Sequence, residues 1–114
     1  MRQRHLQSAR RMIGKEEFES KVLQAEKPVL VDFYSDSCIP CKMVSVTLGD
    51  IEEEYEERLD IYKVNVNYEE ELSGTYQVLA APTLIAFYQG KELGRIKGAA
   101  KKEEILALFD SVWR

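Results

Sequence analysis

The two cysteines of the chain lie three positions apart, in the segment Ser37-Cys38-Ile39-Pro40-Cys41. This segment directly follows an apolar run over 29–34. A thiol placed where a strand leads into a helix is open to solvent and has its partner within bonding distance. A disulfide that closes so short a loop removes little entropy from the unfolded chain, so stabilisation is a weak reason for the pair. The spacing therefore predicts reversible thiol–disulfide exchange.

The elements around this pair are predicted from apolar spacing. The run over 29–34 is apolar on both faces except at Asp32, which is typical of a central strand covered on each side by helices. From Pro40 onward, apolar residues recur at intervals of three and four, which predicts one long helix with a core-facing stripe. The members of that stripe are Val44, Leu48, Ile51, Tyr55 and Leu59.

The remaining pattern completes an α/β domain. We expect an amphipathic helix over 15–25, a strand over 59–66, a short helical turn around 69–76, an antiparallel hairpin of 83–88 and 92–97, and a closing helix over 101–113. This order predicts a mixed sheet flanked by helices, with a site beyond the carboxyl end of a central strand. Cys38 falls at that place.

Composition limits the class of protein. A chain of 114 residues, 45% of them hydrophobic, suits one compact domain. No apolar stretch is long enough to span a bilayer, so we expect a soluble protein without membrane contact. The net charge is −4, and five basic residues lie within the first fifteen positions, which leaves the remainder more acidic. Nucleic-acid binders usually carry the opposite charge on the folded body, so we expect no nucleic-acid partner.

The N-terminal stretch over 1–15 bears on location. It lacks the continuous apolar core of a secretory signal, which makes the cytoplasm the expected compartment. The stretch is rich in arginine and free of acidic residues, a weak likeness to an organellar presequence, but a short solvated extension is the preferred interpretation. A single Cys-x-x-Cys in a reducing compartment fits a redox motif better than a structural disulfide.

Several segments together resemble the thioredoxin family in order and spacing. They are Val31-Asp32-Phe33-Tyr34, Cys38-Ile39-Pro40-Cys41-Lys42, Lys63-Val64-Asn65-Val66, Ala81-Pro82-Thr83-Leu84, Phe87, Gly90 and Gly98. The match runs from about Phe18 to the C-terminus. An aspartate six residues before the first cysteine and a Pro-Thr pair forty-one residues after the second make the combination highly specific.

The resemblance implies a thioredoxin fold, with a central mixed β-sheet flanked by helices on both faces. It implies a dithiol–disulfide oxidoreductase that reduces disulfides of other proteins through a mixed disulfide. No bound cofactor is expected, and electrons would come from NADPH through a thioredoxin-reductase-like flavoprotein. We expect a basic extension over 1–12, a thioredoxin-like domain over 13–114, and a monomer.

Five residues receive chemical roles. Cys38 is expected to attack, because the N–H donors and positive dipole end of a helix N-terminus favour thiolate. Cys41 would then resolve the mixed disulfide. Pro40 suits the first helical turn, where its missing N–H removes no bond. The resemblance makes Asp32 the base for Cys41, with a pKa raised by burial, although a structural carboxylate is the alternative. Lys63 would temper the charge of Asp32 or simply be a surface lysine.

The resemblance also predicts a substrate-binding platform around Cys38. It makes the peptide bond before Pro82 cis, and it lets the backbone of Ala81 pair with an extended substrate segment. The platform residues are Ile39, Pro40, Ala81, Pro82, Gly98 and Ala99. Core packing and turn formation are the alternative roles for these positions, above all for Gly98.

Three residues near the cysteines bear on the surroundings of Cys38. Ser37 and Ile39 stand where the family usually has tryptophan and glycine, so we expect an altered docking surface. Asp36 is expected to point outward and cap the helix.

Two other functions remain open from sequence, and a third, zinc binding, is not expected. The altered flanks could raise the reduction potential and produce a disulfide oxidant or isomerase. The chain could instead be a thioredoxin-like binding module with vestigial cysteines. A zinc site normally needs four ligands, whereas the chain offers two thiols and the distant His5, so no metal is expected.

Overall fold

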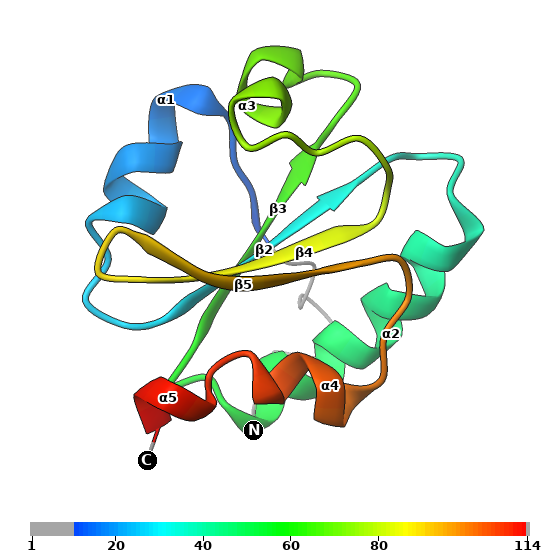
Figure 1. Ribbon diagram of the computed structural model, residues 1–114. Coiled ribbons are helices and arrows are strands. Elements are labelled where there is room, and N and C mark those ends of the chain that lie inside the picture. The colour runs from blue at the N-terminus through cyan, green and yellow to red at the C-terminus, as the bar shows by residue number, and fades with distance from the viewer. Residues whose placement is uncertain (1–10, 114) are drawn as a thin grey trace, which may run out of the picture.

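The computed structural model describes residues 11–113 as a five-stranded sheet with helices on both faces (Figure 1). The strand order is β1-β3-β2-β4-β5. Strands β1, β3 and β2 run parallel, and β4 and β5 each run antiparallel to the strand before them in the sheet. The strands are β1 Arg11–Met12, β2 Val29–Tyr34, β3 Asp60–Asn65, β4 Thr83–Tyr88 and β5 Lys91–Lys97. The predicted mixed α/β sheet is confirmed.

Strand β2 is central and divides the core into two layers. Val29, Val31 and Phe33 are buried in one apolar cluster, and Leu30 is buried in the other. Because alternate residues of a strand point to the same face, Asp32 shares the face of Leu30. That face is the one covered by helix α2, which carries Cys41.

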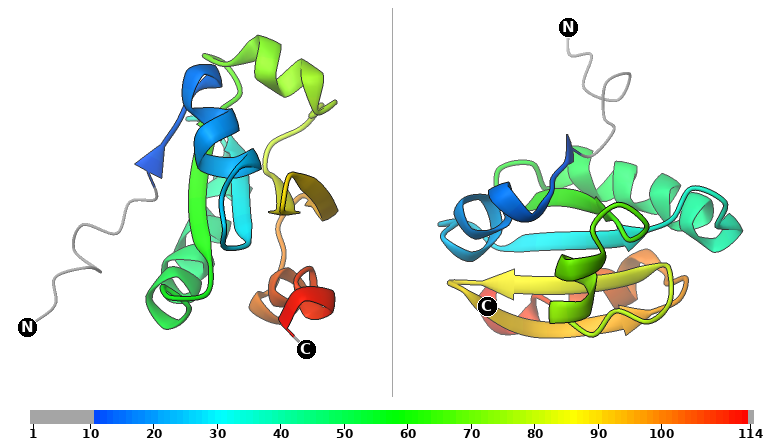
Figure 2. Two further views of the ribbon diagram at one scale, coloured as in Figure 1. Left: turned by 90° about the vertical axis from the view of Figure 1, so that its left-hand side faces the viewer. Right: turned by 90° about the horizontal axis from the view of Figure 1, so that it is seen from above.

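The helices divide between the two faces (Figures 1 and 2). One face carries α1 Lys15–Phe18, its π-helical continuation η2 Glu19–Leu23, and α3 Glu70–Thr75. The other carries α2 Ile39–Glu54, α4 Lys102–Ala107 and α5 Asp110–Trp113. The predicted elements are therefore present on both sides of the sheet.

The long helix is shorter than its apolar stripe predicted. Helix α2 ends at Glu54, and the N–H of Tyr55 bonds to the carbonyl of Ile51 at 2.8 Å. Leu59 lies in the following turn, where its N–H bonds to the carbonyl of Tyr55 at 2.9 Å. Leu59 is only 2% exposed because it packs in the same cluster as Ile51 just before β3 begins. Its burial followed from the spacing, but its assignment to the helix was wrong.

Two other predicted helices are irregular. In the first, the N–H of Gln24 bonds to the carbonyl of Glu19, five residues back, at 2.8 Å. The closing helix is interrupted after Ala107, where the N–H of Phe109 bonds three residues back at 3.0 Å. This tighter turn accompanies a fully buried Phe109, whose ring stacks on that of Trp113 with 5.1 Å between centroids. In the closing helix, tertiary packing therefore accompanies the departure from the regular helical period.

The predicted hairpin is confirmed, with a two-residue turn between β4 and β5. Gln89 and Gly90 have φ values of 53° and 82°. Positive φ at both turn positions matches the right-handed twist of the flanking strands and favours glycine. Strand β5 begins one residue earlier than predicted, at Lys91.

A short edge strand, β1, was not predicted. It pairs in parallel with β3, and the next residue, Ile13, is buried and donates its N–H to the carbonyl of Lys63 at 2.9 Å. Two exposed residues carry no detectable periodicity, so pairing alone defines the strand. His5 and most of the proposed basic extension lie outside the described residues.

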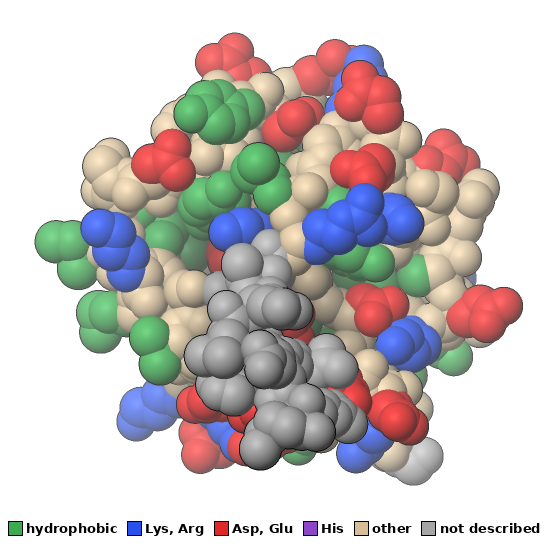
Figure 3. Space-filling model, turned by 180° about the vertical axis from the view of Figure 1, so that it is seen from behind, with side chains coloured by type: hydrophobic (Ala, Val, Ile, Leu, Met, Phe, Trp, Pro, Cys, Tyr) green, Lys and Arg blue, Asp and Glu red, His purple; other side chains and the backbone are tan. Residues whose placement is uncertain are grey.

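Two further features of the described residues are the hydropathy of the helices and the distribution of surface charge. Between residues 11 and 113, no helix has both the length and the hydropathy needed to cross a bilayer. Acidic and basic side chains are interspersed on the face shown in Figure 3, and the described residues there form no single basic patch.

An ion pair within β5 also places Arg95 to bond the segment that leads to Pro82. Arg95 donates two hydrogen bonds to the carboxylate of Glu92, at 2.7 and 2.8 Å. Its third hydrogen bond reaches the carbonyl of Tyr76, just after α3, at 2.8 Å. The hydrogen bond from Arg95, and secondarily its charge, holds the pKa of Glu92 below its usual value, although burial opposes this.

We predict that Glu92→Gln lowers the free energy of unfolding by about 0.5–1 kcal/mol near pH 7, a modest loss because the pair is partly exposed. A carboxyl whose folded pKa is depressed stabilises above its unfolded pKa and loses that contribution as the pH falls through the folded pKa. The difference between wild type and variant should therefore shrink near pH 3, measured by urea denaturation. An exposed control, Glu103→Gln, should show little difference at either pH. An equal Glu92→Gln effect at both pH values would contradict this account.

Candidate active site

Cys38 forms the N-cap of helix α2. Its backbone is extended, with φ −110° and ψ 109°, and its Sγ accepts the N–H of Cys41 at 3.0 Å. Pro40 occupies the first helical turn, as predicted. A helix N-terminus presents unpaired N–H groups and the positive end of the helix dipole, and both stabilise negative charge on a capping sulfur. The position of Cys38 therefore favours its thiolate in the reduced protein.

The prediction that Asp36 caps this helix was wrong. Its carboxylate instead accepts a hydrogen bond from Nδ2 of Asn65, at the end of β3, at 3.4 Å. The extended backbone of Cys38 directs the sulfur to the N–H of the third helical residue, so the sulfur takes the capping place. Asp36 is exposed, in agreement with the outward direction that was expected for it.

The two cysteines differ in access. They are joined by a disulfide with 5.2 Å between their Cα atoms. Cys41 is 5% exposed, whereas Cys38 is partly exposed at the start of the helix. A partner's sulfur can therefore approach Cys38 more easily than Cys41.

Two loops converge beside Cys38. The Ala81–Pro82 peptide bond is cis, as predicted, and the carbonyl oxygen of Ala81 lies 3.5 Å from the Cys38 sulfur. A disulfide sulfur has no proton, so this approach is a contact in the oxidised protein, whereas a thiol could donate across it. The carbonyl of Pro82 accepts the N–H of Gly98 at 2.7 Å, and Gly98 has φ +93°, a conformation that favours glycine. Segments distant in sequence thus meet at the sulfur.

The predicted platform residues differ in exposure. Ile39 is 72% exposed and Ala99 is exposed, whereas Ala81 and Gly98 are partly buried. Pro82 is buried, so it shapes the loop and offers little surface to a partner.

Further apolar surface near the site was not predicted from the sequence. Met43 and Val46 follow Ile39 on α2 at helical spacing and are largely exposed, and Leu79, three residues before Pro82, is 94% exposed. A groove of about 350 Å³ lies between α2 and the segment after β5, lined by Met43, Val44, Thr47, Ala99, Ala100, Lys101 and Glu104. The i, i+4, i+7 spacing could have revealed the stripe on α2, but it does not say that the stripe is exposed.

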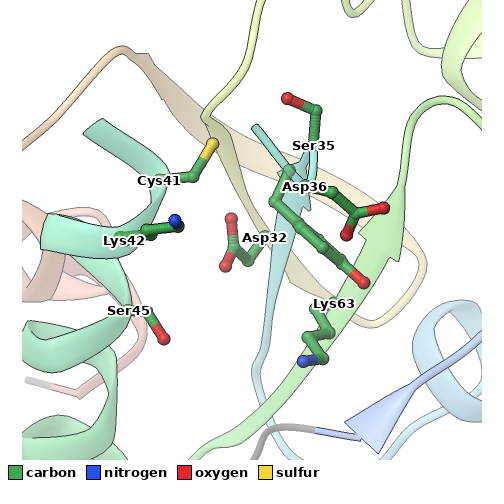
Figure 4. Close-up of a pocket in the computed structure, with 8 residues that line it drawn as sticks. Asp32, Ser35, Asp36, Cys41, Lys42, Ser45 and Lys63 are labelled. Atoms are coloured by element: carbon green, nitrogen blue, oxygen red, sulfur yellow. The ribbon is translucent and has the colours of Figure 1, made fainter. Parts of the chain in front are cut away.

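A second cavity, of about 200 Å³, lies behind Cys41 (Figure 4). Figure 4 shows Asp32 between helix α2, which carries Cys41, and the strand that carries Lys63. The lining residues are Asp32, Tyr34, Ser35, Asp36, Cys41, Lys42, Ser45 and Lys63. Asp32 is 3% exposed, so burial disfavours its charged form. The structure thus brings the predicted carboxylate and the buried thiol to one cavity.

Lys63 lines the same cavity from the neighbouring strand β3. It is the register partner of Asp32 on the neighbouring parallel strand. Its ammonium lies 5.2 Å from the centre of the Tyr34 ring, a cation–π distance. Tyr34 was not predicted as a site residue, although its position two residues after Asp32 places it on the same face of β2.

The described residues offer no evident metal site. Among them, no group of three or more histidine, cysteine, aspartate or glutamate side chains is placed to hold a metal ion.

The arrangement defines a class of protein. Two thiols that bond to each other, one accessible and one buried, suit two-electron exchange with a disulfide. They lie at the end of the central strand of a mixed sheet, beside a cis-proline loop. The class is that of dithiol–disulfide oxidoreductases with a thioredoxin-type fold.

Comparison with known proteins gives the family. The thioredoxin family model matches residues 10–111. A thioredoxin from Acidithiobacillus ferridurans is 37% identical over 99 residues, which cover 87% of this chain and 92% of that protein. A thioredoxin from Mycobacterium tuberculosis is 40% identical over 95 residues, covering 83% and 82%. The chain belongs to the thioredoxin family.

Another relative joins two activities in its name. The bifunctional thioredoxin reductase/thioredoxin of Mycobacterium leprae is 40% identical over 89 residues, which cover 78% of this chain and 19% of that protein.

The unequal access of the two thiols leads to a direct prediction. In the fully reduced protein, iodoacetamide should alkylate Cys38 at least about tenfold faster than Cys41 near neutral pH, because Cys38 is more exposed and its thiolate is stabilised. Peptide mapping by mass spectrometry after short exposure would measure both rates. In urea the two rates should become similar. Equal rates in the folded protein would contradict the asymmetry.

Proposed function

We propose that this protein reduces disulfides of other proteins, with Cys38 as the attacking thiol and Cys41 as the resolving thiol. The observation that carries the proposal is the capping position of the Cys38 sulfur, which accepts the Cys41 N–H at 3.0 Å while Cys41 itself is buried. A stabilised thiolate attacks readily, and a buried neighbour is protected from other reagents.

The reaction proceeds in two exchanges. The Cys38 thiolate attacks one sulfur of the substrate disulfide, that disulfide breaks, and the other substrate sulfur leaves as a thiolate and takes up a proton. Cys41 then loses its proton and attacks the Cys38 sulfur, which breaks the mixed disulfide and releases the second substrate thiol. The substrate gains two electrons and two protons, and the protein gains the Cys38–Cys41 disulfide.

Asp32 is proposed as the base in the second exchange. Its buried carboxylate and the Cys41 side chain line the same cavity, which can admit a bridging water. Taking the Cys41 proton removes a buried charge from Asp32, and the proton can then pass to the leaving substrate thiolate. Lys63 is proposed to moderate the carboxylate charge from the neighbouring strand.

The substrate is proposed to lie as an extended segment across Cys38. The backbone of Ala81 would pair with it, since the Ala81 carbonyl is already 3.5 Å from the sulfur. Ile39, Pro40, Gly98 and Ala99 would supply apolar contact, with Pro82 shaping the loop beneath. Exposed Ile39 enlarges this surface, whereas Ser37 leaves a polar side chain on the other side of Cys38.

The electron source is proposed to be NADPH, acting through a thioredoxin-reductase-like flavoprotein. The fused reductase and thioredoxin of the Mycobacterium leprae relative support this partner. The protein would need no bound cofactor of its own. We further propose a cytoplasmic monomer, and the lone Cys-x-x-Cys supports the compartment because it suits a reducing environment. The domain is proposed over 13–114 after a basic extension over 1–12, and the last two residues of that extension, Arg11 and Met12, pair with the sheet as β1.

Insulin reduction tests this function, with electrons from either a chemical dithiol or NADPH and a bacterial thioredoxin reductase. Wild type should turn over with both, and Cys38→Ser should be inactive because it lacks the attacking thiol. Cys41→Ser should accumulate a mixed disulfide that is visible by mass spectrometry. Activity with the dithiol but not with the reductase would contradict the proposed reductase partner. Inactivity with both electron sources would overturn the proposed disulfide reduction.

One alternative has a specific observation behind it. The residues that flank Cys38 differ from the usual family pattern, and surroundings of the sulfur tune its potential. A disulfide oxidant or isomerase is therefore the second candidate. If the protein were instead a binding module with vestigial cysteines, the Cys38→Ser variant would keep full biological activity.

A further inference from the structure

The cavity behind Cys41 contains a hydroxyl group with no role in the reaction described above. Ser45 follows Cys41 by four residues in α2, so the two side chains lie on one face of the helix. Ser45 is partly buried and lines the same cavity as Asp32. Figure 4 shows Ser45 and Cys41 on the helical wall, with Asp32 on the opposite, strand wall. The helix thus presents a thiol and a hydroxyl to one carboxylate.

Three other polar groups that line the cavity each make a contact of their own. The hydroxyl of Tyr34 donates to the sulfur of Met12 at 3.2 Å, and the Lys63 ammonium lies over the Tyr34 ring. The Asp36 carboxylate accepts from Asn65 at 3.4 Å. None of these three contacts involves Asp32.

Among the described residues, the charged groups that line the cavity with Asp32 belong to, or directly follow, three elements. Lys63 is on β3, Lys42 is on α2, and Asp36 follows β2, the strand that also bears Tyr34. On the remaining side, the register partner of Asp32 on β4 is Leu84, which does not titrate. Ser45 adds a neutral hydroxyl on the helical wall beside these charged groups, and its proton can rotate toward an acceptor.

A hydroxyl at this place has a definite effect on a buried carboxylate. Burial favours the neutral acid, which cannot accept the proton of Cys41. A hydrogen bond donated to the carboxylate favours the ionised form and restricts its orientation. Loss of that bond would leave Asp32 protonated up to a higher pH and would slow the step that depends on it.

We propose that Ser45 is a positioning residue that keeps Asp32 ionised and directed at Cys41 by donating a hydrogen bond, either directly or across one water. This inference rests on the proposed role of Asp32 as base. It concerns only the second exchange, because Cys38 obtains its thiolate from the helix N-terminus.

A two-phase exchange assay separates the steps. The reduced full-length protein is mixed in stopped flow with one equivalent of an aromatic disulfide reagent that releases a coloured thiolate. Attack by Cys38 releases the first coloured thiolate and forms a mixed disulfide, and attack by Cys41 releases the second. The pH dependence of each phase is measured for wild type, Ser45→Ala, Ser45→Thr, Asp32→Asn and the control Ser73→Ala. Ser73 is a buried serine on α3, on the opposite face of the sheet.

Ser45→Ala should leave the first phase unchanged and slow the second by about three- to tenfold near pH 7, with its pH midpoint moved upward. Ser45→Thr, which keeps a hydroxyl, should restore the wild-type profile, and Ser73→Ala should match wild type. Asp32→Asn should slow the second phase at every pH.

The outcomes distinguish the role of Ser45 from that of Asp32. A slow second phase in Asp32→Asn with a wild-type profile in Ser45→Ala would overturn the role of Ser45 alone. A wild-type second phase in Asp32→Asn would overturn the base itself, and the role of Ser45 with it. Slowing of both phases in Ser45→Ala would indicate general damage to the helix and would also contradict the proposal.

Discussion

The N–H of Cys41 points at the Cys38 sulfur from 3.0 Å, and the electrostatics of this contact govern the site. The contact exists because β2 ends and α2 begins within a few residues, with the sulfur in the capping place. A helix of 16 residues then aligns its peptide dipoles behind that sulfur. Thiolate stabilisation, the exposure of Cys38 and the burial of Cys41 one turn later all follow from this one junction.

The central strand supplies the rest of the geometry. Alternation along β2 places Asp32 on the face of α2, so that a carboxylate lies behind the resolving cysteine. Pairing with β3 brings Lys63 alongside, and pairing with β4 begins just after the cis-proline loop. A one-residue slip of β2 would move Asp32 to the opposite core layer, which would separate the proposed base from Cys41. The sheet register is therefore a condition for the chemistry.

Much of this arrangement was predictable, for identifiable reasons. Asp32 could be identified because it is the one charged residue in an apolar strand. The cysteines could be identified from their spacing and the family pattern, and Pro82 from the family pattern. The capping role of the Cys38 sulfur was missed because carboxylates are the commoner caps and backbone direction decides between them. The end of α2 at Glu54 was missed because Leu59 keeps the helical spacing outside the helix. Tyr34 and Ser45 have no pattern of their own and become site residues only through the cavity that they line.

The exposed surface around Cys38 is where this chain departs from the usual family pattern. Ile39 and the exposed residues after it on α2 add apolar area, whereas Ser37 is polar. We propose that exchange chemistry and partner choice depend on different residues. The central claim is that Cys38–Cys41 works as a reducing couple. Equilibration with thiol–disulfide redox buffers measures its potential. We predict a value near the potential typical of thioredoxin, about −270 mV, and a value above about −200 mV would contradict the account.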